Sequence, residues 1–254
     1  MPGGAGLFLR AAELTLSPAC MPQLSLFDLG GYGHLLIEGS VITVTVGIAA
    51  MAVALMLGIL GALARLSPRR WLRNIGATYA TVVRGVPELV LMLIVYYGGT
   101  MLLQMLLSLG GGDVRVDINA FLAGTIVLGF VYGAYATEIF RGAFLAIPHG
   151  QIDAARAFGM SGFTLLWRIQ LPQAWRLAIP GLGNLWLTLL KATSITSVIG
   201  LTELARQADL VKSPTHKPFT TFFLASLLYL AMTAVSDVLR IKVERWASAG
   251  FRRI

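Results

Sequence analysis

Five long apolar stretches run along this chain, and they limit what it can fold into more than any other feature. The stretches are Leu35–Ala64, Ile75–Leu107, Ala120–Ile147, Leu177–Leu201 and Phe219–Val243. A bilayer core of about 30 Å requires about 20 apolar residues per helix, and each stretch is at least that long. The stretches are continuously apolar and do not alternate over about ten residues, which favours helices over barrel strands. The sequence therefore predicts an all-α integral membrane protein with five transmembrane helices.

Composition excludes the other broad classes of protein. Of 254 residues, 56% are hydrophobic and only 13% are charged, about half of the roughly 25% that soluble domains carry. So few charges cannot cover a water-exposed surface, and so many apolar residues are not typical of a disordered chain. One cysteine, Cys20, and three histidines exclude a disulfide framework and leave almost no ligands for zinc or iron–sulfur clusters. We therefore expect no metal site and no cofactor bound by this chain.

Lysine and arginine are unevenly distributed between the ends of the spans. Most follow the first span, separate the third from the fourth, or follow the fifth: Arg65, Arg69, Arg70, Arg73, Arg141, Arg156, Arg168, Arg176, Arg240, Lys242, Arg245, Arg252 and Arg253. The opposite ends carry fewer: Arg10, Arg115, Arg206, Lys212 and Lys217. Because cytoplasmic ends carry the excess, we expect the N-terminus outside and the C-terminus in the cytoplasm. The cations form no patch, so the net charge of +8 does not indicate nucleic-acid binding.

Two segments are expected: an N-terminal tail over residues 1–23 and a transmembrane domain over residues 24–254. The tail has no long apolar region and no small-residue cleavage pattern, which argues against a signal peptide. Met21 is a second plausible start that leads directly into the first span. Residues 1–20 are therefore either a disordered tail or an over-extended start.

The loop over residues 148–172, between the third and fourth spans, contains residues typical of the ends of two short helices. Pro148 and Gly150 are expected to break the preceding span. Asp153 is expected early in the first short helix, where a negative charge suits the helix dipole. Gly159 then ends that helix as a C-terminal glycine cap.

The second short helix of this loop begins and ends at equally recognisable residues. Ser161 is a good N-cap, and Pro172 is expected to end or redirect the helix. Ala154 and Ala155 in the first helix form a small-sided patch against which another protein could pack. On local physics alone, an ordinary amphipathic loop explains the segment equally well.

The spacing of this loop resembles the signature of permease subunits of ABC importers. Asp153-Ala154-Ala155 is separated by three residues from Gly159, which is separated by nine residues from Ile169; one residue then precedes Leu171-Pro172. In that family the loop is the coupling helix that docks into a groove of a cytoplasmic ATPase, and the first residue is glutamate where this chain has aspartate. The resemblance implies these coupling residues: Gly150, Asp153, Ala154, Ala155, Gly159, Leu171 and Pro172.

Two further segments resemble the polar amino-acid branch of these permeases. They are Arg84–Gly98, which reads RGVPELVLMLIVYYG, and Gly129–Phe144, which reads GFVYGAYATEIFRGAF. Together they are most similar to permease subunits for histidine, lysine, arginine and ornithine, with opine permeases as near relatives. The resemblance covers roughly residues 24–245 and implies five helices per subunit, paired about a pseudo-two-fold axis.

Charged residues within the apolar stretches need a partner or a water-filled path, because each costs at least ~2.5 kcal/mol at mid-membrane. Arg84 and Glu88 are four residues apart and can pair on one helical face, and Glu138 is expected at a similar depth. In one interpretation the three form a buried ion network that fixes helix register. In the other, a carboxylate faces the path and meets a cationic substrate; Tyr135, in the motif of the third span, belongs to the same predicted pathway.

The fourth span contains helix breakers and hydroxyl side chains. Pro180–Asn184 and Lys191–Ser197 favour a discontinuous helix lining a substrate route, with Asn184, Lys191 and Ser194 on the pathway. An equally plausible alternative is a kink whose free carbonyls are capped by Ser and Thr side chains. Lys191 could hold a substrate carboxylate or pair with Asp237. Residues 203–210 resemble the family's gate on the outer face.

Enzymatic motifs are absent from the sequence. No Ser/His/Asp arrangement, HExxH or GxxxxGK[ST] loop occurs, so we expect no catalytic residues, and ATP must be bound by a partner. The sequence predicts a permease subunit in the bacterial inner membrane for polar, basic amino acids. Its expected partners are a second permease subunit in a heterodimer, two ATPase subunits, and a periplasmic or lipid-anchored substrate-binding protein. The alternatives are a proton-coupled secondary transporter using Glu88 and Glu138, and a membrane-bound structural or enzyme subunit.

Overall fold

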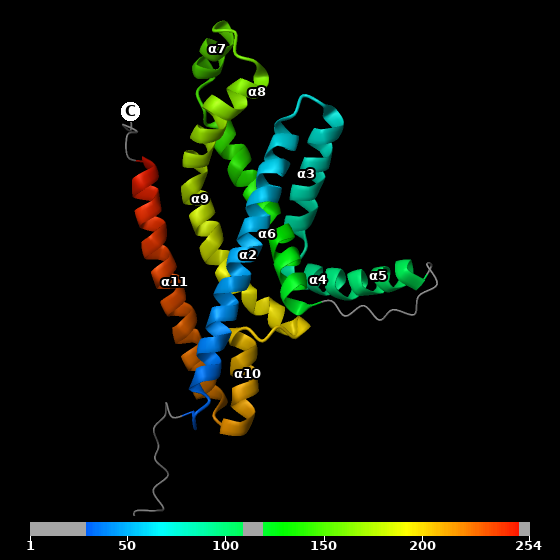
Figure 1. Ribbon diagram of the computed structural model, residues 1–254, viewed down its shortest axis with the longest axis vertical. Helices are drawn as coiled ribbons and strands as arrows, with labels where there is room; N and C mark the ends of the chain where they lie inside the picture. The colour runs from blue at the N-terminus through cyan, green and yellow to red at the C-terminus, as the bar shows by residue number, and fades with distance from the viewer. Residues whose placement is uncertain (1–28, 109–118, 249–254) are drawn as a thin grey trace, which may run out of the picture.

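The computed structural model describes residues 29–108 and 119–248, in which every regular element is helical (Figure 1). The expected tail over residues 1–23, Arg115, Arg252 and Arg253 lie outside the described residues. Five described helices are long and apolar enough to cross a membrane. The predicted all-α fold with five candidate spans is therefore confirmed.

Two long helices, α2 (Gly33–Leu66) and α6 (Ala120–Leu145), pack along each other and form the centre of the bundle. Their contact depends on small residues. A Cβ added at Gly58 would lie 2.5 Å from the Cβ of Ala136, and one added at Gly129 would lie 2.5 Å from the Cβ of Val53. Glycine at these positions lets the two backbones approach closely, as is common between membrane helices.

The other helices surround this pair (Figure 1). Helix α9 (Leu171–Ala192) packs on α6, and α11 (Pro218–Ser248) lies beside α9. The short α7 (His149–Ala157) and α8 (Gly162–Leu165) lie at the end of the bundle where α2 ends. Helix α10 (Leu204–Thr215) lies at the opposite end, against α2 and α11.

The second apolar stretch, Ile75–Leu107, contains one candidate span but is not one helix. Helix α3 (Arg70–Gly85) packs against α2 and α6 and ends before an extended pair, Val86 and Pro87. Proline lacks an amide hydrogen and disfavours helix at the residue before it. The chain then continues through α4 (Glu88–Leu93), a π turn (Ile94–Gly98) and α5 (Gly99–Ser108), which leave the bundle in Figure 1. The apolar span is Glu88–Ser108.

The fourth span is more continuous than the sequence predicted. Helix runs from Gly162 to Ile199, including a π turn (Leu166–Gln170) and a 3₁₀ segment (Thr193–Ile199). Pro172 does not end a helix, because it lies at the start of α9 directly after the π turn, and helix continues on both sides of it. The break predicted at residues 180–184 is also wrong, since α9 passes through Pro180.

Two glycines next to Pro180 serve packing between helices instead. A Cβ at Gly181 would lie 2.8 Å from Cγ2 of Ile139, and a Cβ at Gly183 would lie 2.5 Å from Cγ of Arg240. Side chains of α6 and α11 therefore occupy the space that larger residues on α9 would need.

Candidate functional site

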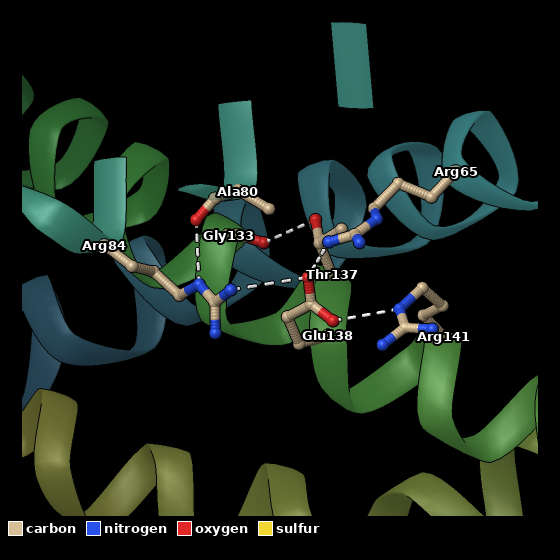
Figure 2. Close-up of polar contacts among 7 residues, drawn as sticks. All are labelled: Arg65, Ala80, Arg84, Gly133, Thr137, Glu138 and Arg141. Atoms are coloured by element: carbon tan, nitrogen blue, oxygen red, sulfur yellow. Dashed lines mark hydrogen bonds and ion pairs between the residues drawn. The ribbon is translucent and has the colours of Figure 1, made fainter. Parts of the chain in front are cut away.

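Glu138 on α6 is the centre of an ion cluster that joins three helices (Figure 2). Its carboxylate accepts hydrogen bonds from Arg65 on α2, from Arg84 Nη2 on α3 at 3.5 Å, and from Arg141 Nε one turn along α6 at 2.9 Å. The Nε of Arg84 also donates to the carbonyl oxygen of Ala80 at 2.8 Å. Three guanidinium groups thus share one carboxylate, and the cluster carries excess positive charge.

The predicted pairing of Arg84 with Glu88 does not form among the described residues. The break at Pro87 places the two residues on different helices, so their spacing of four no longer puts them on one face. Glu88 instead accepts a hydrogen bond from the hydroxyl of Tyr132, at 3.3 Å. Sequence reasoning correctly joined Arg84 to Glu138 but missed Arg65 and Arg141; the i,i+3 spacing of Glu138 and Arg141 could have indicated the second.

A cavity of about 390 Å³ lies between α3, α4, α6 and α9. Five residues predicted for the substrate pathway line it together with five others. The ten are Arg84, Glu88, Tyr132, Tyr135, Glu138, Ile139, Gly181, Asn184, Leu185 and Thr188. Tyr132, which holds Glu88, and Glu138 are six residues apart on α6, a rise of about 9 Å. The cavity therefore offers acidic, basic and neutral polar groups along its length.

Lys191 and Ser194 do not line this cavity. Lys191 is exposed near the end of α9, and the suggested pair with Asp237 is wrong because Asp237 binds Arg240, with Oδ1 and Nη2 2.7 Å apart. The hydroxyl of Ser194 donates to the carbonyl oxygen of Lys191 at 2.9 Å, and Thr193 and Thr196 make similar bonds one turn back. Capping of free carbonyls therefore accounts for these hydroxyls.

The loop over residues 148–172 forms the two short helices that its capping and helix-breaking residues predict. Gly159 has a φ of +76°, a left-handed conformation suited to a glycine cap, and the hydroxyl of Ser161 accepts the amide of Thr164 at 3.3 Å. The preceding span, α6, ends at Leu145, before Pro148 as expected, and Gly150 lies within α7. One detail was wrong: Asp153 is the fifth residue of α7, not early in it, and makes an exposed ion pair with Arg156 at 3.9 Å.

The two alanines of this loop point in different directions. Ala155 is buried with Ile152 in the core, whereas Ala154 is exposed beside Asp153, so the predicted patch of two alanines is wrong. Two side chains that sequence reasoning overlooked dominate the outer surface: Phe158 is 86% exposed and Phe163 is 72% exposed.

The two residues that close the predicted coupling set lie at the base of the loop. Leu171 packs against the core cluster, and Pro172 is exposed. Of the seven residues in the set, the structure therefore leaves Gly150, Asp153, Ala154, Gly159 and Pro172 on the surface.

A buried carboxylate at the opposite end of the bundle was not singled out from the sequence. Glu203 has no exposed surface and caps α10 by accepting the amide of Arg206 at 2.9 Å. It also accepts the hydroxyl of Tyr229 on α11 at 2.6 Å and that of Thr43 on α2 at 3.3 Å. These bonds fix α10 to both spans. The predicted helix over residues 203–210 thus has Glu203 as its cap and extends to Thr215.

On the outer surface of α10, Lys212 donates a hydrogen bond to Asp209. This bond lowers the pKa of Asp209 and favours its charged form. Among the described residues, no group of three or more His, Cys, Asp or Glu side chains is placed to hold a metal ion.

Comparison with known proteins identifies the family of this chain and its sequence relatives. Residues 54–248 match the family described as the binding-protein-dependent transport system inner membrane component. The chain is 40% identical to the histidine/lysine/arginine/ornithine transport system permease protein HisQ of Salmonella typhimurium, over 89% of this chain and 98% of that protein. It is 42% identical to the nopaline transport system permease protein NocQ of Agrobacterium fabrum, over 91% of this chain and 99% of that protein.

Solved structures of ABC transporters are also similar in fold to this chain. A crystal structure of an amino acid ABC transporter with histidines matches with a TM-score of 0.73 at 32% identity, covering 84% of this chain and 94% of that one. An inward-facing structure of the MetNI methionine ABC transporter matches with a TM-score of 0.70 at 16% identity, covering 85% and 97%, which shows similarity of fold alone.

Proposed function

Since this chain belongs to the family of binding-protein-dependent transport system inner membrane components, we propose that it is the non-catalytic, multi-pass inner-membrane subunit of an ABC importer for basic amino acids or related opines. A second permease subunit, paired as a heterodimer, completes the pore. Two ATPase subunits bind ATP on the cytoplasmic side, where α7 lies, and a substrate-binding protein delivers substrate to the end carrying α10. This orientation follows from the excess of Lys and Arg near α7.

The cavity beside Glu138 is the observation that carries this proposal. A basic amino acid has a carboxylate at one end and a cation at the other. Arg84, in a cluster with excess positive charge, suits the α-carboxylate, and Glu88, whose only hydrogen bond within the described residues comes from neutral Tyr132, suits the cationic side chain. Asn184 and Thr188 supply neutral polar groups between α9 and the substrate. The rise of about 9 Å between Tyr132 and Glu138 is comparable to the reach of an extended basic amino acid.

Replacing Glu88 with glutamine should weaken uptake of basic amino acids by 10- to 100-fold in kcat/KM. A hydrogen bond to a charged group contributes about 1.5–3 kcal/mol, and each 1.4 kcal/mol is a factor of ten. The measurement is uptake of radiolabelled arginine and histidine by the complete importer in proteoliposomes. Glu38→Gln, at an exposed carboxylate outside the cavity, is the matched control. Equal uptake by all three proteins would remove Glu88 from the substrate site.

The α7 loop, over residues 148–172, is the proposed docking site for the ATPases. Its outer surface presents Asp153, Ala154, Phe158 and Phe163, while Ile152 and Ala155 anchor the helix to the core. A helix anchored in this way transmits a push from the ATPase into α6 and α9, between which it is connected. The movement would expose the cavity alternately to the two sides of the membrane.

An Asp153→Arg/Ala154→Arg variant should lose the ATPase during purification. Both changes are at exposed positions, so the fold is retained, whereas a change at the buried Ala155 would damage packing. The measurement is a mild-detergent pull-down of the tagged chain from native membranes, with the bound proteins identified by mass spectrometry. Leu210→Arg, on α10 at the other end of the bundle, is the charge-inserting control. Retention of the ATPase by the double variant, or its absence from the wild type, would contradict docking on α7.

A further inference from the structure

Tyr135 on α6 lies between the two ends of the cavity beside Glu138. Four residues of α6 line that cavity: Tyr132, Tyr135, Glu138 and Ile139. Residues at this spacing share one face of a helix, and Tyr135 is separated by a rise of about 4.5 Å from both Tyr132 and Glu138. A ligand that extends along α6 from Tyr132 to Glu138 therefore passes Tyr135.

Tyr135 contributes its ring to the cavity, whereas its hydroxyl holds no other element in place. The side chain is partly buried, and its ring packs against that of Tyr132 with the centroids 5.8 Å apart. Tyr132 and Tyr79 each donate a hydrogen bond, to Glu88 and to the carbonyl oxygen of Phe130. Within the described residues, the hydroxyl of Tyr135 makes no hydrogen bond. The aromatic ring is thus the part of Tyr135 that a ligand meets.

The carboxylate of Glu88 lies beside this pair of rings and is free to attract a cation. It accepts the hydroxyl of Tyr132 at 3.3 Å, and no ion pair within the described residues neutralises it. Glu138, by contrast, is already shared by three guanidinium groups. A cationic side chain in the cavity is therefore drawn to the end that carries Glu88, next to the rings of Tyr132 and Tyr135. Aromatic faces attract cations that lie within about 6 Å of the ring centre.

The two kinds of cation that basic amino acids carry differ in how well they suit an aromatic ring. A guanidinium group is planar, delocalised and weakly hydrated, so it stacks on aromatic faces, whereas an ammonium group is compact and strongly hydrated. Asn184 and Thr188 on the facing helix α9 can accept a hydrogen bond from either cation, so they do not discriminate between them. The ring of Tyr135 does.

We propose that Tyr135 determines specificity in this cavity, favouring guanidinium over ammonium side chains and thus arginine over lysine and ornithine. The proposal rests on the proposed function, because it concerns the same cavity and the same class of substrate. Enzymes and transport sites discriminate by differences between competing substrates, so the ratio of the two rates is the quantity that this residue controls.

Replacing Tyr135 with leucine should lower the preference for arginine over lysine by about 3- to 10-fold, the effect of losing one cation–π contact. The measurement is the ratio of kcat/KM for arginine and lysine uptake by the complete importer in proteoliposomes. The same substrate-binding protein is used throughout, so its own preference cancels between variants. Tyr135→Phe keeps the ring and should keep the wild-type ratio. Tyr97→Leu, at a tyrosine that is exposed and outside the cavity, is the matched control.

The ratio separates specificity from packing. If Tyr135 only packed against Tyr132, Tyr135→Leu would lower arginine and lysine uptake equally together with the unfolding temperature, and the unchanged ratio would overturn the proposal. An equal fall of the ratio in Tyr135→Phe would also overturn it, because the hydroxyl and not the ring would then discriminate. Failure of the proposed function is distinguishable, since it appears as the absence of uptake of both substrates by the wild-type importer.

Discussion

Replacing Glu138 with glutamine should destabilise the importer by about 3 kcal/mol and remove most of its transport activity. The carboxylate is the shared acceptor for Arg65, Arg84 and Arg141, and its side chain is only 20% exposed. Without it, three guanidinium groups face one another with no carboxylate between them. Removing one partner of a fully buried pair costs about 3–5 kcal/mol, and this cluster is partly exposed, so the lower end of that range is expected. The measurements are the unfolding temperature of the purified complex and arginine uptake by proteoliposomes.

A double variant tests whether charge balance is the cause. Arg65→Gln combined with Glu138→Gln removes one of the excess guanidinium groups, and it should recover part of the unfolding temperature lost in Glu138→Gln alone. Glu38→Gln is again the control, because that carboxylate is exposed and outside the cluster. A Glu138→Gln variant of normal stability that loses only cationic substrates would contradict a structural role and favour direct contact between Glu138 and the substrate.

Replacing Gly129 with valine should prevent the bundle from forming. The added Cβ would lie 2.5 Å from Cβ and 2.6 Å from Cγ1 of Val53, and 3.1 Å from the carbonyl oxygen of Ala50. Overpacking usually costs about 1–3 kcal/mol, and here the obstacle includes backbone, so α2 and α6 must separate to relieve it. The yield of monodisperse protein in detergent should fall at least tenfold, as measured by size-exclusion chromatography.

Gly142→Val is a matched control on the same helix. A Cβ at Gly142 would meet nothing within 4 Å, so the same chemical change should leave yield and unfolding temperature near wild type. Equal losses in both variants would mean that valine disturbs α6 through helix propensity and not through the contact with α2.

The residues that line the cavity could be selected from the sequence, but their contacts with one another could not be predicted from it. Arg84, Glu88 and Glu138 were selected because charged groups are costly in a membrane, and Asn184 because it lies among the helix breakers of the fourth span. The structure places all four around one cavity. Their pairing was not predictable from spacing. Arg65 lies 73 positions from Glu138, and only the packing of α2 on α6 brings them together.

The prolines of this chain illustrate the same limit. Pro87 ends a helix, whereas Pro180 lies within one and Pro172 lies in a first turn. All three have the same local chemistry. Residue type alone therefore does not decide which proline ends a helix.

The sequence by itself determined the number and class of the spans and the helix–turn–helix form of the α7 loop. These depend on quantities that sum along the chain, such as apolar length, and on caps such as Gly159 and Ser161 that act within a few residues. Tertiary structure alone decided which charges meet, which alanine of the loop is buried, and where the cavity beside Glu138 lies. Those features arise from contacts between residues far apart in the chain, whose energies exist only after the helices have packed.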